Sequence, residues 1–264
     1  MSADGTPIAL ERIGDGPAVV VIGGALSSRA AAEPLARLLG SDFTVLTYDR
    51  RGRGDSGDTP PYDVRREVED LDAVIGTVGG DASVFGHSSG AVLALEAVLV
   101  RGPRIRMLAL YEPPFIVDDS RPPLPDDYVE RLEELVDEGR RGDAVEYFMV
   151  SGPGVPPEAV AQMREAPMWP EMEAMAHTIA YDGRVMGDAM RGSADALGRW
   201  ASVDVPTLVL DGGASPPWQR SATQALARVL RRSTHRSLPG QTHAADPELL
   251  ASALRDFFRD EPAA

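Results

Sequence analysis

Short apolar runs alternate with segments of helical periodicity along much of this chain, and this alternation restricts its fold more than any other feature. The apolar run Ala18–Ile22 is followed by Arg29–Leu39, in which apolar residues recur at helical spacing. Strands that alternate with helices form a parallel sheet covered on both faces, so we predict an α/β fold. The other expected strands are Phe43–Tyr48, Ala82–Phe85, Ile105–Tyr111, Thr207–Leu210 and Thr234–Leu238, and the other expected helices are Val64–Val78, Ala91–Val100, Gln219–Leu230 and Pro247–Phe258.

The alternation stops between Glu112 and Ser202, where the pattern predicts helices and no strand. The expected helices are Asp127–Gly139, Asp143–Met149, Pro157–Arg164 and a long one from Glu171 to about Trp200. Most of the methionines lie here, and their flexible side chains suit an adaptable apolar pocket or ordinary packing between helices. We therefore predict a core domain formed by residues 1–112 and 203–264, with residues 113–202 inserted as a helical lid.

A serine stands in the turn between two of the expected buried elements. The pentapeptide GHSSG at positions 86–90 joins the strand Ala82–Phe85 to the helix Ala91–Val100, which is apolar almost all round. A sharp turn there would raise the serine above the sheet edge, and the flanking glycines allow strand and helix to approach closely. A solvated surface turn does not need a buried element on each side, so the context favours Ser88 as a nucleophile.

A serine hydroxyl is a weak nucleophile unless a base within hydrogen-bond reach takes its proton. The chain has four histidines. His87 adjoins the serine, so its side chain should point elsewhere, while His177 falls within the expected lid and His235 within a late strand. His243 lies in the loop between the last strand and the closing helix, from which it can reach the turn at Ser88. We therefore predict His243 as the base.

Composition removes several classes of function. The chain of 264 residues has no cysteine and no lysine, which excludes disulfides, thiolate chemistry and Schiff bases on lysine. Its formal net charge of −15 argues against nucleic acid or an anionic membrane surface as a partner. No dinucleotide fingerprint, Walker loop or metal-ligand spacing is present, so we predict no cofactor and no metal. The sequence has no leader pattern and no run of eighteen apolar residues, so we expect a cytoplasmic protein. A homodimer is a further expectation.

The loop after the strand Phe43–Tyr48 holds three arginines, Arg50, Arg51 and Arg53. Such a loop could bind an anion, but paired arginines suit crowded turns, and the chain has an excess of acidic residues. We expect these arginines to pair with nearby carboxylates of the sequence, which include Asp49, Asp55 and Asp58.

Together these features resemble the α/β-hydrolase-fold family of serine hydrolases. The resemblance extends from about Asp4 to Phe258, with the lid as its least specific part. Four motifs carry it: GHSSG at 86–90, IGGAL at 22–26, YDRRGRGDS at 48–56 and GQTH at 240–243. It implies a mostly parallel sheet of eight strands, or of seven if the first strand is missing, with the lid inserted after the sixth strand.

The resemblance also implies where a developing oxyanion would be stabilised. Members of this family use the backbone amide after the nucleophile, here Ser89, and one amide from the glycine turn after an early strand. By position the second donor is Ala25, with Gly24 as its neighbour. A backbone donor needs no particular side chain, so alanine is acceptable there.

The acid that would orient the histidine departs from the family pattern. The family usually places an aspartate shortly after the strand Thr207–Leu210, but Ser215 occupies that position here. Two carboxylates could replace it: Glu112, directly after Ile105–Tyr111, and Asp211, at the tip of its own strand. We favour Glu112, because a longer side chain at the adjacent strand end can reach the imidazole, and we keep Asp211 as the alternative.

These features predict a hydrolase of small or medium, largely apolar carboxylic esters, lactones or thioesters that forms an acyl-enzyme on Ser88. A serine at this position argues against epoxide hydrolysis and dehalogenation, which use a carboxylate nucleophile in this fold. Two alternatives stay open. One is C–C bond cleavage, or an acyl-transfer or cyclisation step, on the same fold. The other is a ligand-binding protein with vestigial catalysis, which the serine at position 215 makes conceivable.

Overall fold

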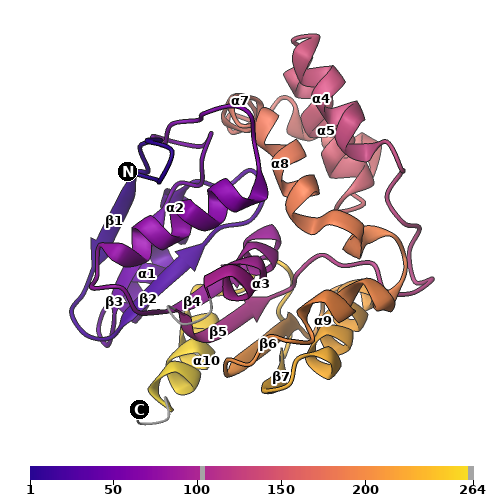
Figure 1. Cartoon of the computed structure of the whole chain (residues 1–264). Coiled ribbons are helices and arrows are strands. Elements are labelled where there is room, and N and C mark those ends of the chain that lie inside the picture. The colour runs from indigo at the N-terminus through magenta and orange to yellow at the C-terminus, as the bar shows by residue number, and fades with distance from the viewer. Residues whose placement is uncertain (102–104, 261–264) are drawn as a thin grey trace.

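One sheet of seven strands forms the centre of the computed structural model, which describes residues 1–101 and 105–260 (Figure 1). The strands are β1 (Leu10–Ile13), β2 (Ala18–Ile22), β3 (Thr44–Tyr48), β4 (Ala82–His87), β5 (Ile105–Tyr111), β6 (Thr207–Gly212) and β7 (Ser233–Leu238). Their order is β1-β3-β2-β4-β5-β6-β7, with β1 antiparallel to β3 and the other pairs parallel. The last four residues of the predicted core, 261–264, lie outside the described residues.

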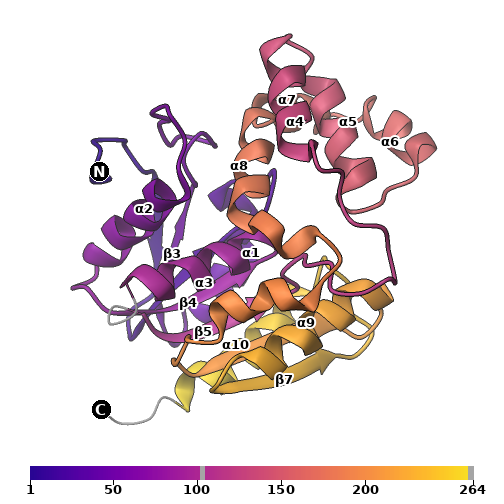
Figure 2. The ribbon, with the colours of Figure 1, turned by 45° about the vertical axis from the view of Figure 1, so that its right-hand side comes forward.

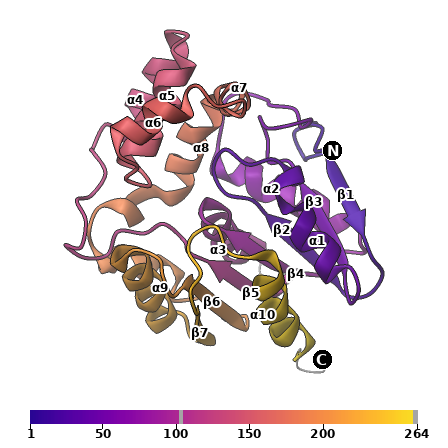
Figure 3. The same cartoon turned by 180° about the vertical axis from the view of Figure 1, so that it is seen from behind.

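Helices cover both faces of this sheet, as the alternation predicted. They are α1 (Glu33–Leu39), α2 (Val64–Gly76), α3 (Ser89–Arg101), α9 (Pro217–Val229) and α10 (Pro247–Arg259). Successive side chains of a strand point to opposite faces, so Val20 packs into the core shared with α2, α3 and α9. Its neighbour Val21 packs into the opposite core, beneath α1 and α10, which Figure 3 brings into view from behind.

Residues 112–206, all of which the structure describes, contain helices and no strand. The elements are α4 (Tyr128–Asp137), α5 (Arg141–Ser151), α6 (Pro157–Met163), α7 (Trp169–Ala174), α8 (His177–Met186) and the 3-10 helices η3 (Gly187–Met190) and η4 (Ala194–Trp200). The prediction of one long helix from Glu171 to about Trp200 was wrong. Gly187 has a φ of +52°, through which an α-helix cannot continue, and α8 ends there. In Figure 2 these helices stand to one side of the sheet, and α8 packs against α2 and α3.

The sheet has seven strands, the smaller of the two numbers that the resemblance implied. Before β2, the described residues form one short strand, β1. The helical segment therefore follows the fifth strand of this chain and not the sixth. No helix among residues 1–101 and 105–260 is both long and apolar enough to cross a membrane.

Candidate active site

Ser88 lies between β4, which ends at His87, and α3, which begins at Ser89. Its backbone φ is +56°, a left-handed conformation that residues other than glycine seldom adopt. The Ser88 amide donates to the Tyr111 carbonyl at 2.9 Å, and the Ala91 amide donates to the Ser88 carbonyl at 2.9 Å. These bonds hold the sharp turn between strand and helix that the sequence predicted.

The glycines at positions 86 and 90 let the strand and the helix of this turn pack closely. A Cβ at Gly86 would lie 2.5 Å from the Cα of Ala91, and a Cβ at Gly90 would lie 2.5 Å from the carbonyl oxygen of Ile22. Both separations are too short for any side chain. A larger residue at either position would therefore push the serine turn away from the sheet.

His243 is held against a buried carboxylate. It lies in the loop between β7 and α10, and its Nδ1 is 2.7 Å from Oε2 of Glu112, whose side chain is fully buried. The other oxygen of Glu112, Oε1, accepts a hydrogen bond from the Gly212 amide at 2.8 Å. Both carboxylate oxygens are thus occupied, and one of them faces the imidazole.

Two side chains from the sheet hold the loop that carries His243. Nε2 of His87 lies 3.0 Å from the His243 carbonyl, and the Tyr111 hydroxyl donates to the Thr242 carbonyl at 2.6 Å. Burial, together with the charge of His243, lowers the pKa of His87 to about 4. The His87 ring is therefore neutral at neutral pH and can donate Nε2–H to the loop.

Asp211, the alternative acid, lies in a separate cluster. Its carboxylate is 2.6 Å from Nε2 of His235 and accepts hydrogen bonds from the hydroxyls of Ser237 at 2.5 Å and Thr223 at 2.9 Å. His235 and Ser237 are two residues apart on β7, so their side chains stand on the same face of the sheet. Of the two carboxylates considered, Glu112 is therefore the one that contacts the predicted base.

Ser88 and His243 line the same cavity, whose volume is about 730 Å³. Gly24, Ala25 and Ser89 line it too, so the residues of the expected oxyanion hole surround the serine. A Cβ at Gly24 would lie 2.8 Å from the Cβ of Ser88, which means that the Gly24 backbone runs directly beside it. Much of the remaining wall is apolar and comes from the helical segment, including Tyr128, Phe148, Met149, Met172, Met186 and Met190.

Backbone strain is concentrated around this cavity. In the described part of the chain, the non-glycine residues with positive φ are Leu26 at +53°, Ser88 at +56° and Glu112 at +46°. Such conformations cost about 1–3 kcal/mol each and cluster at functional sites, where the surrounding structure holds them. Leu26 and Ser88 line the cavity and Glu112 contacts His243, so the strain marks the same site as the side chains do.

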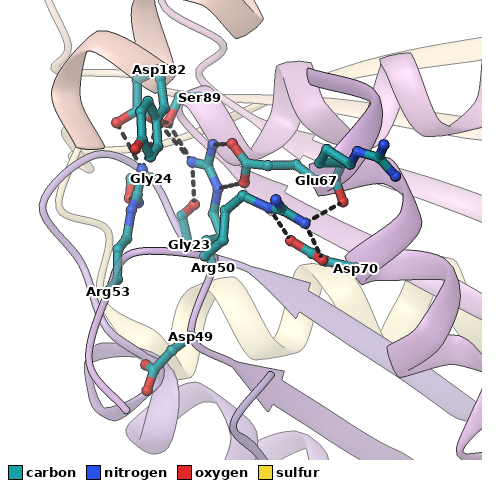
Figure 4. A network of polar contacts seen from close by, with 12 residues as sticks. Gly23, Gly24, Asp49, Arg50, Arg53, Glu67, Asp70, Ser89 and Asp182 are labelled. Carbon is teal, nitrogen blue, oxygen red and sulfur yellow. Dashed lines mark hydrogen bonds and ion pairs between the residues drawn. The ribbon is translucent and has the colours of Figure 1, made fainter. Parts of the chain in front are cut away.

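The arginines of the loop after β3 pair with carboxylates, as expected. The partners of Arg50 and Arg53, however, come from other elements and not from the same loop, so the expectation of partners nearby in the sequence was wrong for these two. Nε of Arg50 is 2.6 Å from Glu67 of α2, and Nη1 of Arg50 is 2.7 Å from Asp182 of α8 (Figure 4). Arg53 also binds Asp182, at 2.8 Å. The expected partner Asp49 lies apart from this cluster in Figure 4. The fold brings α8 onto the loop from far along the chain.

Neither Gln219 nor Asp182 belongs to the site predicted from the sequence. Gln219, in the first turn of α9, places its Nε2 3.0 Å from Nδ1 of His243, and nothing in the sequence marks it. Asp182 does carry a signal, since it lies on the buried face of α8, three residues from Ile179 and four from Met186. A charged residue at such a position must find a partner inside the protein.

The groups at this site suit nucleophilic acyl chemistry. A hydroxyl and an imidazole line one cavity, and a buried carboxylate contacts Nδ1 of the imidazole. This is the set that a serine nucleophile with a general base requires. Within the described residues, 1–101 and 105–260, no cluster of three or more histidine, aspartate or glutamate side chains could hold a metal ion.

Comparisons with known proteins identify the family of this fold. A family model described as "Alpha/beta hydrolase family" matches residues 19–253. An alpha/beta hydrolase from Sphaerobacter thermophilus is 57% identical in sequence, and its crystal structure aligns over 97% of this chain and 98% of that chain with a TM-score of 0.90. A thermophilic esterase from Thermogutta terrifontis is 23% identical and shares the fold over 97% of this chain and 94% of its own, with a TM-score of 0.72.

A curated protein matches over a shorter stretch. The probable oxidoreductase EphD of Mycobacterium tuberculosis is 36% identical over 98 residues. This stretch is 34% of the present chain but 17% of EphD, so the chain covers only a small part of that relative's length.

Proposed function

Because the chain belongs to the alpha/beta hydrolase family, we propose that it is a serine hydrolase of small or medium, largely apolar carboxylic esters, lactones or thioesters. One observation carries the proposal: Nδ1 of His243 contacts the buried Glu112 at 2.7 Å, and His243 shares its cavity with Ser88. A histidine that merely begins a helix has no need of a buried carboxylate. A nucleophile–base–carboxylate series at a cavity is the arrangement that acyl transfer uses.

In the first half of the reaction, Glu112 accepts the hydrogen bond of Nδ1–H and keeps Nε2 of His243 unprotonated. Nε2 takes the proton of the Ser88 hydroxyl as Oγ attacks the substrate carbonyl carbon. The carbonyl oxygen gains negative charge, which the backbone amides of Ala25 and Ser89 stabilise. His243 then gives its proton to the departing alcohol or thiol, and the acyl group stays on Ser88.

In the second half, a water molecule takes the place of the leaving group. His243 accepts a proton from the water as its oxygen attacks the acyl carbon. The same two backbone amides stabilise the second oxyanion. The bond to Ser88 breaks, Oγ recovers a proton from His243, and the carboxylic acid leaves.

The cavity wall supports an uncharged, apolar acyl group. Among the described residues that line it none is an arginine, and the carboxylate that reaches it, Asp182, is already paired with Arg50 and Arg53. An anionic acyl group would lose its hydration there without gaining a counter-charge. A volume of about 730 Å³ falls within the range of cavities that bind small or medium ligands. We also propose that residues 113–202, which supply much of the apolar wall, form the lid of a core made by residues 1–112 and 203–264.

Active-site labelling tests the proposal directly. A fluorophosphonate probe should label the wild type on one serine and leave Ser88→Ala unlabelled. Ser252→Ala, which removes an exposed serine of α10, is the matched control and should be labelled like the wild type. A series of p-nitrophenyl esters then measures turnover as a function of acyl length. Labelling that persists in Ser88→Ala would refute the assignment of the nucleophile.

The same assays separate the alternatives. A wild type that is not acylated at all would favour a ligand-binding protein with vestigial catalysis. A wild type that is acylated but turns over every ester poorly would favour acyl transfer, cyclisation or C–C bond cleavage on the same fold.

A further inference from the structure

A carboxylate of the helical segment is buried beside the serine turn. Asp182 of α8 is 1% exposed, and its Oδ1 accepts hydrogen bonds from Nη1 of Arg50 and Oγ of Ser89, each at 2.7 Å (Figure 4). Its Oδ2 accepts a hydrogen bond from Nη2 of Arg53 at 2.8 Å. Three groups of the core thus meet on one side chain that lies 93 residues beyond Ser89 in the sequence.

One of these groups, Arg53, also fixes the peptide that joins Gly24 to Ala25. Nη1 of Arg53 donates to the Gly24 carbonyl, which accepts a second hydrogen bond from Oγ of Ser27 at 2.8 Å. A trans peptide is planar, so its N–H points opposite to its C=O. The hold on the Gly24 carbonyl therefore sets the direction of the Ala25 N–H, on a loop that lines the same cavity as Ser88.

The second proposed oxyanion donor is reached from the same carboxylate. Ser89 is the first residue of α3, and its hydroxyl lies between Asp182 and Nη1 of Arg50, which is 3.2 Å away. The amides of the first turn of a helix have no partner within the helix and are free to bind a ligand. Both amides of the proposed oxyanion hole are therefore tied to Asp182, one through Arg53 and the other through the Ser89 hydroxyl.

The charges of this cluster balance. Arg50 is shared between Asp182 and Glu67, whose two oxygens lie 2.6 Å and 2.7 Å from its Nε and Nη2. Burial acts to raise the pKa of Asp182, but the charges of Arg53 and Arg50 outweigh it and hold that pKa below its ordinary value. Without the negative charge of Asp182, Arg50 would keep Glu67 while Arg53 would lose the carboxylate that binds its Nη2. The effect should therefore fall on Arg53 and on the Gly24 carbonyl.

Further contacts hold α8 on the core around Asp182. The ring of Tyr181 stacks on that of Tyr62 with 3.9 Å between centroids, and the Tyr181 hydroxyl donates to Asp58 at 2.8 Å. The Tyr62 hydroxyl in turn donates to Glu67 at 2.7 Å. The position of the Asp182 carboxylate therefore depends on the docking of α8.

We propose that Asp182 is a positioning residue through which the docked α8 sets the geometry of the oxyanion hole. This inference rests on the proposed hydrolase function, because it takes the amides of Ala25 and Ser89 as the oxyanion donors. The segment that carries α8 also supplies much of the cavity wall. One inserted element thus shapes the substrate site and completes the geometry for catalysis, and turnover requires that it be docked.

Asp182→Asn tests the inference, with Asp70→Asn as the matched control. Asp70 of α2 is also 1% exposed and accepts two hydrogen bonds of 2.8 Å from Arg51, whose other donors bind Asp4 and the Arg66 carbonyl. Each variant removes one buried negative charge from an arginine, so we expect both to lower the melting temperature. Only Asp182→Asn should lower kcat for a p-nitrophenyl ester, by about 10- to 100-fold, with KM changed by less than about threefold.

Two milder variants cover the case in which Asp182→Asn does not fold. Arg53→Lys keeps the charge balance, but one ammonium group cannot bind the Asp182 carboxylate and the Gly24 carbonyl as a guanidinium does. Ser89→Ala keeps every charge and the backbone amide. We expect kcat to fall about tenfold in Arg53→Lys and about threefold in Ser89→Ala. Affinity for an alkyl boronic acid, which forms a tetrahedral adduct with the serine, should fall by the same factors.

The inference is overturned if Asp182→Asn, or Arg53→Lys in its place, keeps the wild-type kcat and the wild-type boronic acid affinity. It is also overturned if Asp70→Asn loses as much kcat as Asp182→Asn, because the loss would then follow stability and not position. Failure of the proposed function looks different. The wild type itself would then escape labelling by the fluorophosphonate at Ser88 and would not hydrolyse the esters.

Discussion

Replacing Glu112 by glutamine should remove most of the catalytic rate, for a reason that follows from its two contacts. Oε1 accepts a hydrogen bond from the Gly212 amide at 2.8 Å, and Oε2 lies 2.7 Å from Nδ1 of His243. Glutamine offers one oxygen and one NH₂ group, and the buried Gly212 amide requires the oxygen. The NH₂ group then faces Nδ1, which must accept a hydrogen bond. The imidazole proton moves to Nε2, and His243 can no longer take the proton of Ser88.

Loss of this control over the tautomer lowers kcat by about 10⁴ in a serine–histidine–carboxylate triad, which corresponds to about 5.5 kcal/mol of activation free energy. The assay is steady-state kcat for a p-nitrophenyl ester, with the p-nitrophenolate burst measuring acylation separately. Asp211→Asn is the matched control, since it also converts a buried carboxylate to an amide but at a residue that contacts His235. We expect its kcat to stay within about twofold of the wild type and its free energy of unfolding to fall by about 1–3 kcal/mol.

Either of two results would refute this reasoning. Glu112→Gln could keep kcat within about tenfold of the wild type, in which case the contact with Nδ1 is structural and does not control the tautomer. Alternatively, Asp211→Asn could lose as much activity as Glu112→Gln, and the loss would then reflect the general stability of the strand ends.

Three further changes test other parts of the site. In the Glu112→Gln background, Gln219→Glu should restore kcat by about 10- to 100-fold, because Nε2 of Gln219 lies 3.0 Å from Nδ1 of His243 and a carboxylate there can accept its proton. Gln219→Met in the same background should restore nothing. The second change is His87→Gln. Burial and His243 lower the pKa of His87 from 6.5 to about 4. Between about pH 4 and pH 6.5 the unfolded chain therefore binds a proton at His87 that the native chain does not. Wild-type stability should therefore fall by up to about 3 kcal/mol relative to His87→Gln as the pH drops through this window, and denaturant unfolding at each pH measures the difference. Met172→Ala enlarges the cavity by removing part of its apolar wall. It should raise kcat/KM for longer acyl chains relative to shorter ones by about tenfold. An unchanged preference would exclude Met172 from the acyl site.

The turn at Ser88 could be predicted because it depends on residues that are neighbours in the chain. An apolar strand, two glycines and an apolar helix suffice to specify it, and the structure has the strand end at His87 and the helix begin at Ser89. The loop position of His243 could be predicted for a similar reason, since it follows the last strand and precedes the closing helix. The positive φ of Leu26 could not, because leucine seldom adopts a left-handed backbone and nothing in the sequence marks one there.

The choice between Glu112 and Asp211 needed the structure. The two residues lie at the carboxyl ends of the neighbouring parallel strands β5 and β6, so position in the sequence puts both near the same sheet edge. The directions of their side chains distinguish the two residues. Glu112 has left β5 with a φ of +46° and its side chain reaches His243, whereas Asp211 still belongs to β6 and faces His235.

The amino-acid sequence by itself determined the mostly parallel sheet, the serine turn and the helical character of residues 113–202, because periodicity and adjacent residues decide such features. Only the tertiary structure decided that Arg50 and Arg53 bind Asp182 and not the nearby Asp49. A buried charge pairs with whichever opposite charge the packing brings within reach, and here the packing of α8 brings one from 132 residues beyond Arg50.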